Sequence, residues 1–252
     1  MKKTLFSILL FGISVQDGIP QKGKFSLASE NGFSIPTLTY ARNYRPLSAF
    51  TSNFHLGYYL SDKSKLGLHF GTINHRYDAQ TTADNVFLNA EPSMFGEPLI
   101  GVKVSGYNKY QHLLLGLLYI YEIPLGENFR LDLKASLGVD LFQGGRVAIT
   151  TYYDDAPFNR NMREELILKS GNCSSIYSFA GLGFRHLTTD RISFGLSLEL
   201  GSTTLNYSQS FTQESLDDLY SYEKNSGKVN HTYNAGWFNI YGGVTYLLGK
   251  GK

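Results

Sequence analysis

The segment from Phe129 to Phe142, FRLDLKASLGVDLF, alternates apolar and polar residues with a period of two. Its odd positions up to Leu141 are all apolar, whereas the even positions up to Asp140 carry Arg, Asp, Lys, Ser, Gly and Asp. This period indicates a β-strand with one apolar face and one charged face. Such a strand fits a water-soluble protein with its apolar face inward, or a bilayer with its apolar face outward. The surroundings of the two faces therefore decide the class of protein.

Similar alternation predicts eight strands in the chain of 252 residues, at 24–35, 50–60, 65–77, 110–123, 129–143, 174–187, 191–207 and 233–248. Three tight polar connections, SDKSK (61–65), PLGEN (124–128) and TTDR (188–191), alternate with longer ones at 36–49, 78–109, 144–173 and 208–232. In an up-and-down barrel, this order places every tight turn at one end and every long loop at the other. Outer-membrane barrels have this asymmetry, whereas a soluble lipocalin-type barrel has no reason to sort its loops in this way.

The N-terminal segment has the pattern of a secretory signal peptide. Lys2 and Lys3 precede the apolar run TLFSILLFGISV (4–15), which is too short to span a bilayer as a helix. We therefore expect a signal peptide at 1–18, with the cleavage position left open, and a barrel domain at 19–252. A buried first strand or helix is the alternative for this segment.

Charge and cysteine content exclude several classes of function. The formal net charge is only +2, so nothing indicates binding to nucleic acid. Cys173 is the only cysteine, which excludes an internal disulfide. The sequence has neither a His/Cys cluster with metal-ligand spacing nor a Gly-rich phosphate loop, so we expect no cofactor and no metal. The acidic stretch QESLDDLYSYE (213–223) lacks the ligand spacing of a calcium loop and predicts a solvated loop or short helix.

The polar faces of the predicted strands are rich in small residues, which suit the crowded lumen of a narrow barrel. The leucines of the opposite faces would then contact lipid, and the charged residues would pair inside the lumen because buried charges must be paired. The predicted lumen charge network consists of Glu30, Arg130, Asp132, Lys134, Asp140, Arg185 and Glu199. Aromatic residues beside the tight turns predict an interfacial girdle of Tyr58, Tyr121, Phe129, Phe184, Phe194 and Tyr246. The pattern does not explain why Leu114, Leu118 and Ile120 share the lumen face.

Together these features resemble the small eight-stranded outer-membrane β-barrels of the OmpA-transmembrane-domain and OmpX kind, including the PorT-like group often called porin family. The resemblance covers nearly the whole mature chain. It rests on the signal peptide, the segment QKGKFSL (21–27), the alternation of turns and loops, and the final strand. In this family the last strand carries an assembly signal of the form polar, x, Gly, x, x, aromatic, x, hydrophobic, which the barrel insertion machinery reads. The matching residues here are Tyr241, Gly243, Tyr246 and Leu248, although Tyr241 occupies the polar position and the chain continues through GKGK.

We therefore predict an all-β fold, an eight-stranded antiparallel up-and-down transmembrane β-barrel in contact with the lipid of a Gram-negative outer membrane. The favoured role is structural or interactive, with an extracellular or envelope protein bound through the long external loops. A narrow channel or porin for small solutes is the first alternative, which lumen charges of mixed sign disfavour. A lipid-modifying enzyme is the second. His186 with Ser193, or His231 with Ser208, would be its candidate pairs, but no local motif supports either, so we predict no enzyme.

The third long loop has a pattern of its own. Val147, Ile149 and Tyr153 alternate with other residues on one flank, and Leu166 and Leu168 do so on the other. This predicts a hairpin that projects beyond the membrane and offers strand edges to a partner, the mode called strand addition. A short helix over NRNMREELILKSG (159–171) is the alternative.

Overall fold

The computed structural model describes residues 22–37, 46–78, 80–81, 83–84, 99–105, 109–155, 160–216 and 224–248. The predicted signal peptide and residues 217–223 of the acidic stretch lie outside these ranges. Nearly all of the described chain is strand. The strands are β1 (Phe25–Thr37), β2 (Pro46–Leu47), β3 (Ala49–Tyr59), β4 (Ser64–Tyr77), β5 (Leu99–Ser105), β6 (Lys109–Pro124), β7 (Phe129–Gln143), β8 (Arg146–Asp155), β9 (Arg160–Ser170), β10 (Cys173–Leu187), β11 (Ile192–Leu216) and β12 (Lys224–Leu248). In the described ranges, no helix is long and apolar enough to cross a bilayer.

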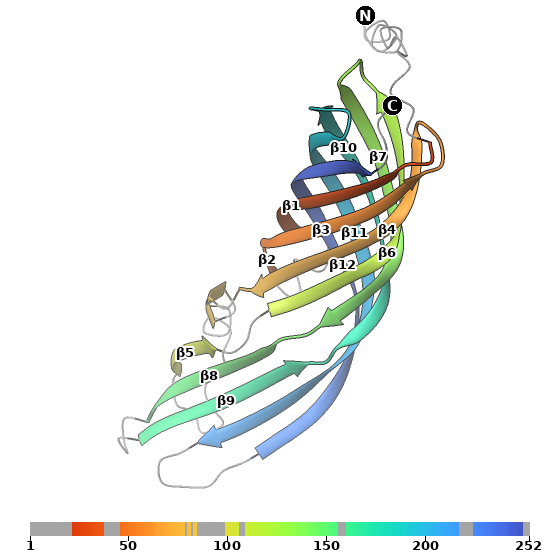
Figure 1. The fold of residues 1–252 in the computed structure, drawn as a ribbon. Helices are drawn as coiled ribbons and strands as arrows, with labels where there is room; N and C mark the ends of the chain where they lie inside the picture. Colours follow the sequence, from red (N-terminus) through yellow and green to blue (C-terminus); the bar gives the residue numbers. More distant parts are fainter. Residues whose placement is uncertain are drawn as a thin grey trace, which may run out of the picture.

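Eight of these strands close into an antiparallel barrel (Figure 1). They follow one another around it in the order β1, β3, β4, β6, β7, β10, β11 and β12, and β12 pairs with β1 to complete the ring. The short strand β2 pairs with β4 at its edge. The predicted fold class, an all-β eight-stranded up-and-down transmembrane barrel, is confirmed. The predicted boundaries of β7 match the structure, whereas β11 and β12 are longer than predicted.

The tight connections lie together at one end of the barrel, which we call the turn end. They join β3 to β4, β6 to β7 and β10 to β11. In the second of these, the amide of Leu125 donates to the carbonyl of Phe129 at 3.0 Å, and Gly126 adopts a φ of 119°. Few residues other than glycine tolerate this conformation, so Gly126 suits the reversal. We call the opposite end of the barrel the loop end.

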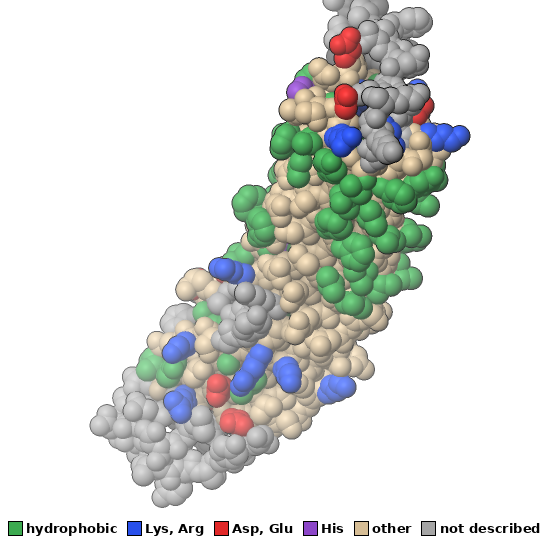
Figure 2. Space-filling view, in the orientation of Figure 1, with side chains coloured by type: hydrophobic (Ala, Val, Ile, Leu, Met, Phe, Trp, Pro, Cys, Tyr) green, Lys and Arg blue, Asp and Glu red, His purple; other side chains and the backbone are tan. Residues whose placement is uncertain are grey.

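The outward face of the barrel is an apolar belt, seen as green side chains in Figure 2. Leu137 and Leu196 are more than half exposed, whereas Asp140 and Glu199 on the opposite faces of the same strands are fully buried. The outward apolar positions of β7 run over twelve residue steps from Phe129 to Leu141. At ~3.3 Å per residue and a tilt of ~40°, this corresponds to a height of roughly 30 Å, close to the thickness of a bilayer core.

At the loop end, β11 and β12 continue past the barrel rim and are joined by β9, β8 and β5 (Figure 1). Beyond the barrel, β11 and β12 pair with each other up to Glu214 and Lys224, and the order β5, β8, β9, β11, β12 forms an open sheet. We call this sheet the extension. The predicted hairpin is confirmed as β8 and β9, and the alternative of a helix over 159–171 is wrong because Arg160–Ser170 form β9.

The expectation that this hairpin offers its edges for strand addition is also wrong. The outer edge of β8 pairs with β5, and the outer edge of β9 pairs with β11. Each of these edges is already occupied by a strand of the same chain. A sequence pattern identifies strands one at a time, but the partner of each edge depends on segments far away in the sequence.

Candidate functional site in the lumen and the extension

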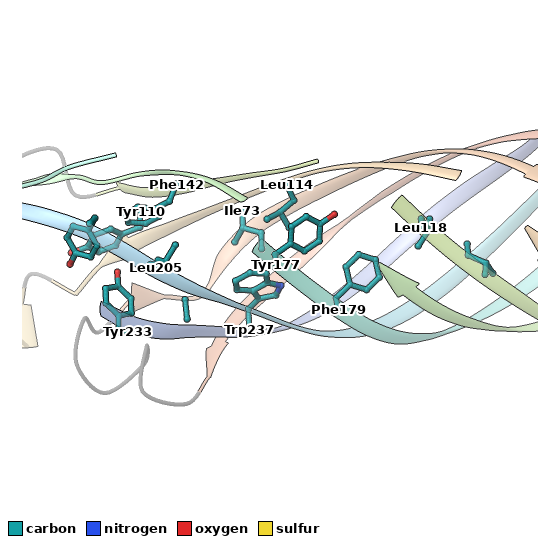
Figure 3. Close-up of a cluster of buried hydrophobic side chains, with 13 residues drawn as sticks. Ile73, Tyr110, Leu114, Leu118, Phe142, Tyr177, Phe179, Leu205, Tyr233 and Trp237 are labelled. Carbon is teal, nitrogen blue, oxygen red and sulfur yellow. The ribbon is translucent and has the colours of Figure 1, made fainter. Parts of the chain in front are cut away.

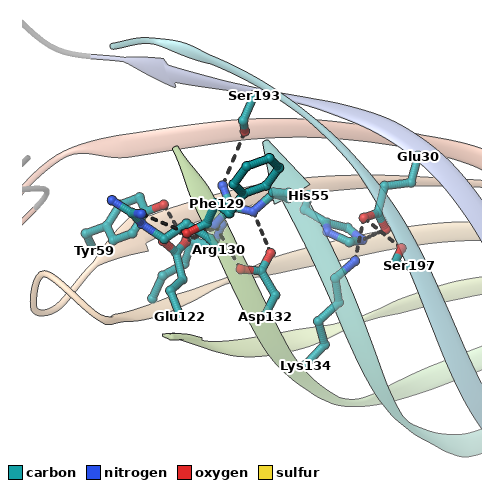
Figure 4. A network of polar contacts seen from close by, with 12 residues as sticks. Glu30, His55, Tyr59, Glu122, Phe129, Arg130, Asp132, Lys134, Ser193 and Ser197 are labelled. Atoms are coloured by element: carbon teal, nitrogen blue, oxygen red, sulfur yellow. Dashed lines mark hydrogen bonds and ion pairs between the residues drawn. The ribbon is translucent and has the colours of Figure 1, made fainter. Parts of the chain in front are cut away.

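A cluster of buried charges fills the lumen near the turn end (Figure 4). Arg185, on β10, donates from Nε to Asp132 at 2.6 Å and from Nη2 to the same carboxylate at 2.9 Å. Its Nη2 also lies 2.6 Å from Glu122, which is 3.5 Å from the Nζ of Lys65 and accepts a 2.6 Å hydrogen bond from Tyr59. Two cations and two carboxylates therefore neutralise one another, as burial requires.

A second charged cluster lies further from the turn end. The Nζ of Lys134 forms an ion pair with Glu30 and lies 3.5 Å from Glu199. Glu199 accepts a 3.3 Å hydrogen bond from Asn53, and Glu30 accepts one of 3.1 Å from Ser197. These side chains come from four strands, β1, β3, β7 and β11, so the cluster cross-links the wall through its interior (Figure 4).

Aromatic and apolar side chains fill the lumen from the level of this cluster toward the loop end (Figure 3). Tyr177 and Trp237 are fully buried there, and the Oη of Tyr177 lies 2.6 Å from the Nδ1 of His69. The cluster consists of Ile73, Tyr110, Leu114, Leu118, Ile120, Phe142, Tyr177, Phe179, Leu205, Tyr207, Tyr233, Ala235 and Trp237. Its existence explains the apolar residues on the lumen face of β6. That stretch of the lumen is a packed core rather than an aqueous channel.

The structure distributes the seven residues of the predicted charge network over separate groups. Asp132 and Arg185 belong to the first cluster, and Glu30, Lys134 and Glu199 belong to the second. Asp140 is apart from both, and its carboxylate lies 2.8 Å from His112.

Among the described contacts, the Arg130 side chain binds backbone carbonyls and forms no ion pair. Its Nη1 donates to the carbonyls of Gly126 at 3.0 Å and Phe129 at 2.8 Å, which fixes the tight turn before β7. Sequence reasoning missed three lumen residues that complete the groups: Lys65, Glu122 and His112. Their alternation could have identified them, since Lys65 shares its face with Gly67 and Glu122 shares its face with Ile120.

The structure does not bring together the pairs considered for catalysis. The side chain of Ser193 is buried in the lumen, where it accepts a 3.3 Å hydrogen bond from Arg185. His186 is exposed on the outer face, with its ring centroid 4.8 Å from that of Phe129. The ring of His231 packs on Tyr207, and strand alternation directs the neighbouring Ser208 away from that ring. Among the described residues, no group of three His, Cys, Asp or Glu side chains is arranged to hold a metal ion.

The faces of the extension follow from strand register. β11 and β12 pair without a shift along their whole length, so Phe211 faces the same side as the lumen residues Leu205 and Tyr207. Phe211 is opposite Leu168, which is opposite Val147. These residues, with the buried Ile149 and Tyr153, give the extension an apolar inner face.

At the base of the extension, β7 and β10 therefore exchange their inner and outer faces as they become β8 and β9. In β7 the even positions face the lumen, as buried Asp140 and Phe142 show, whereas in β8 the odd position Val147 faces inward. The exchange occurs at Gly144 and Gly145, and at Gly171 and Asn172 in the partner strand. The register of β9 and β10 against β11 shifts by one residue between Ser170 and Tyr177, which is the signature of a β-bulge in that strand. The pairing of β7 and β8 with β10 and β9 keeps one register throughout.

The outer face of the extension carries exposed cations. Arg146 on β8 is directly opposite Lys169 on β9. The next two strands continue this row with Ser210 on β11 and Lys228 on β12. Figure 2 shows Lys and Arg side chains gathered over the extension, apart from the green belt. The exposed cations of this face are Lys103, Arg146, Arg163, Lys169 and Lys228.

Tyr153 and Glu164 make the main polar contact of the inner face. The Oη of Tyr153 donates to the Glu164 carboxylate at 3.4 Å. Burial raises the pKa of the Tyr153 hydroxyl, and the neighbouring Glu164 charge acts in the same direction. The side chain is therefore neutral at physiological pH and serves as a hydrogen-bond donor.

The positions of the predicted assembly signal lie on both faces of β12. Tyr241 is buried in the lumen, where its Oη lies 3.2 Å from the Thr51 hydroxyl. Gly243 is opposite Glu30, and a Cβ added to it would lie 2.7 Å from Cγ of that side chain. Tyr246 and Leu248 are exposed on the outer face near the turn end.

No protein-family model matches the chain, and no curated protein matches it. Among solved structures, Neisserial surface protein A has 12% sequence identity and a TM-score of 0.44, covering 88% of this chain and 96% of that chain. The outer membrane protein OprG from Pseudomonas aeruginosa has 14% identity and a TM-score of 0.41, covering 91% and 98%. Ail, the attachment invasion locus protein of Yersinia pestis, has 12% identity and a TM-score of 0.36, covering 90% and 99%.

These neighbours are small eight-stranded outer-membrane β-barrels, the class that the sequence resembles. The similarity is one of strand architecture and carries no information about a ligand or partner. The identification of this chain as an eight-stranded barrel rests on its own strand pairing, which closes between β12 and β1, and not on the similar proteins.

Proposed function

We propose that this chain is an outer-membrane protein with a structural or interaction role, in which a non-conducting barrel holds the extension outside the cell. The observation that carries the proposal is the five-stranded sheet beyond a barrel whose lumen is filled by ion pairs and a packed core. A lumen filled in this way leaves no continuous aqueous path, and strand pairing makes the extension a rigid platform.

The proposed orientation has the turn end in the periplasm and the extension outside. Outer-membrane barrels have short periplasmic turns and longer extracellular loops, and the aromatic side chains near the turns match an interfacial girdle. The assembly signal fits this orientation, since Tyr246 and Leu248 present apolar surface at the turn end of β12. We propose that the barrel insertion machinery reads these two residues together with Tyr241 and Gly243.

We propose that recognition of a protein partner uses side chains of the extension rather than strand edges of the hairpin. The outer face combines the exposed cations with Glu165 and Glu214, which are opposite each other in register. Exposed charges on a rigid sheet suit a partner of complementary charge pattern.

Cysteine labelling tests location and orientation. The background variant is Cys173→Ser, to which either Arg163→Cys in the extension or Lys63→Cys at the turn end is added, since both side chains are exposed. A membrane-impermeant maleimide should label the Arg163→Cys variant on intact cells and the Lys63→Cys variant only after the outer membrane is permeabilised. The opposite result would reverse the proposed orientation, and equal labelling in a soluble fraction would exclude membrane insertion.

A shortened hairpin tests the interaction role. Thr150 and Glu165 are opposite each other, so residues 151–164 can be replaced by Asn-Gly, which forms a two-residue hairpin turn. The barrel should still fold, as judged by heat-dependent electrophoretic mobility, while any partner cross-linked to the intact protein is lost. Lumen variant Lys134→Met is the matched control, since it leaves the extension unchanged. Retention of every partner by the shortened protein would show that the hairpin does not recognise them.

A further inference from the structure

Two adjoining concavities lie on the outer surface where β7 becomes β8. The one nearer the apolar belt has a volume of about 550 Å³, and its lining includes Leu113 and Leu141. The second has a volume of about 290 Å³, and its lining includes Arg146 and Lys169. Both are lined by the amide side chains at positions 111, 143 and 172, so they form one continuous depression with an apolar end and a basic end.

The basic end holds two like charges close together. Arg146 and Lys169 are directly opposite each other on β8 and β9, which places their Cβ atoms roughly 5 Å apart. Like charges in this position destabilise a sheet unless an anion lies between them. The lining of the second concavity contains no Asp or Glu.

Carboxylates of the same face are too distant to compensate this pair. The first ones, Glu165 and Glu214, lie four residues further along β9 and β11 than Lys169 and Ser210. Four residues of strand correspond to about 13 Å, which exceeds the Debye length of about 8 Å at physiological ionic strength. Among the side chains that the structure describes, the pair therefore presents an uncompensated charge of two cations.

The exchange of faces at Gly144 and Gly145 gives the pair its position. Without it, Arg146 would continue the even positions of β7 and face inward, as Phe142 does. The exchange of faces instead directs it outward, directly beyond the lipid-exposed Leu141. The basic end thus lies at the border of the apolar belt, where lipid headgroups meet a membrane protein.

We propose that this depression binds the phosphate-bearing headgroup of a lipid in the surrounding outer leaflet. Arg146 and Lys169 bind the phosphate oxygens, the amides of Gln111, Gln143 and Asn172 hydrogen-bond neighbouring polar groups of the head, and an acyl chain follows the apolar end. An arginine fork and a lysine ammonium are both effective phosphate ligands. The proposal rests on the outer-membrane location and orientation given above, and it adds a ligand that those do not specify.

The test uses the full-length barrel in detergent micelles, with diphosphorylated lipid A as the probe and native mass spectrometry as the measurement. The wild type should retain lipid A, and the double variant Arg146→Gln/Lys169→Gln should bind it at least about tenfold more weakly, as expected for loss of two charge-assisted contacts. The matched control is Lys63→Gln/Arg191→Gln, which removes the same charge from exposed residues at the turn end and should bind as the wild type does.

Two further arms identify the source of the anion. Chemically dephosphorylated lipid A should be retained no better by the wild type than by the Arg146→Gln/Lys169→Gln variant. Millimolar inorganic phosphate should fail to displace lipid A, because it lacks the contacts of the acyl chain. Equal retention of lipid A by wild type and variant, retention of the dephosphorylated lipid by the wild type as strong as that of lipid A, or complete displacement by inorganic phosphate would each overturn the lipid site.

This assay is independent of the proposed function. Binding in a micelle has no sidedness, so a reversed orientation in cells would appear in the cysteine labelling and leave lipid retention unchanged. Heat-dependent electrophoretic mobility shows whether each variant is folded before its binding is compared. Failure of the folded, correctly oriented wild-type barrel to retain lipid A would refute the lipid site alone.

Discussion

Substitution of Arg185 by methionine removes the cation at the centre of the turn-end cluster while keeping an unbranched side chain. In the wild type, the guanidinium donates to Asp132 at 2.6 and 2.9 Å, to Ser193 at 3.3 Å, and forms an ion pair of 2.6 Å with Glu122. The side chain is buried, and so are both carboxylates. Methionine fills much of the same space but leaves these acceptors without their main donor.

The expected loss of unfolding free energy follows from the partners that Glu122 and Asp132 retain in the variant. Glu122 retains Lys65 at 3.5 Å and the Tyr59 hydroxyl at 2.6 Å, so most of its compensation survives. Asp132 loses both hydrogen bonds of its bidentate pair, each contributing roughly 1.5–3 kcal/mol. Removal of one partner from a buried ion pair costs about 3–5 kcal/mol. We therefore expect Arg185→Met to lower the free energy of unfolding by about 3–5 kcal/mol.

Urea titration of the barrel in lipid vesicles, followed by Trp237 fluorescence, measures this change. The double variant Arg185→Met/Asp132→Asn restores neutrality and should recover a large part of the loss. Arg191→Met is the control, since this exposed arginine lies in the neighbouring turn and its removal should change little. A free energy of unfolding for Arg185→Met within about 0.5 kcal/mol of the wild type would refute the argument that these charges stabilise one another.

Three other predictions concern the wall, the packed core and the conductance. Leu196→Arg should cost about 2–4 kcal/mol in lipid vesicles because the side chain faces the apolar belt, whereas Val229→Arg, also at an exposed position but in the extension, should cost little; similar costs would place the bilayer elsewhere. Gly116→Val should lower stability by about 1–3 kcal/mol, since a Cβ there would lie 2.4 Å from the Tyr177 hydroxyl, and an unchanged urea midpoint would contradict this close packing. In planar bilayers the protein should carry no steady current, and Lys134→Ala should not open it because the aromatic cluster still fills the lumen; stable single-channel steps in either protein would support a channel.

The sequence by itself determined the strands of the barrel and their faces. Alternation in FRLDLKASLGVDLF is a local property of the backbone, since successive side chains point to opposite sides, and it was sufficient to assign Leu133 outward and Asp132 inward. The order of tight and long connections was likewise sufficient for an up-and-down barrel. For the same reason the hairpin of β8 and β9 could be predicted from the pattern of its two flanks.

Pairing among side chains inside the lumen could not be predicted in this way. Which cation meets which carboxylate depends on the stagger of strands around the closed barrel, and no single strand contains that information. The tertiary structure thus directs Arg130 to backbone carbonyls, Asp140 to His112, and Glu122 into the cluster of Arg185. It also shows that an aromatic core, and not charge alone, fills the lumen.

The extension is the part that only the tertiary structure decided. The edges of the β8–β9 hairpin are covered because β5 and the far half of β11, both distant in sequence, pair with it. The outward position of Arg146 depends on the exchange of faces at Gly144 and Gly145, because an exchange of faces reverses the direction of every side chain that follows. Strand periodicity continued through Gly144 and Gly145 would place the cation in the lumen, whereas the folded chain places it at the edge of the apolar belt.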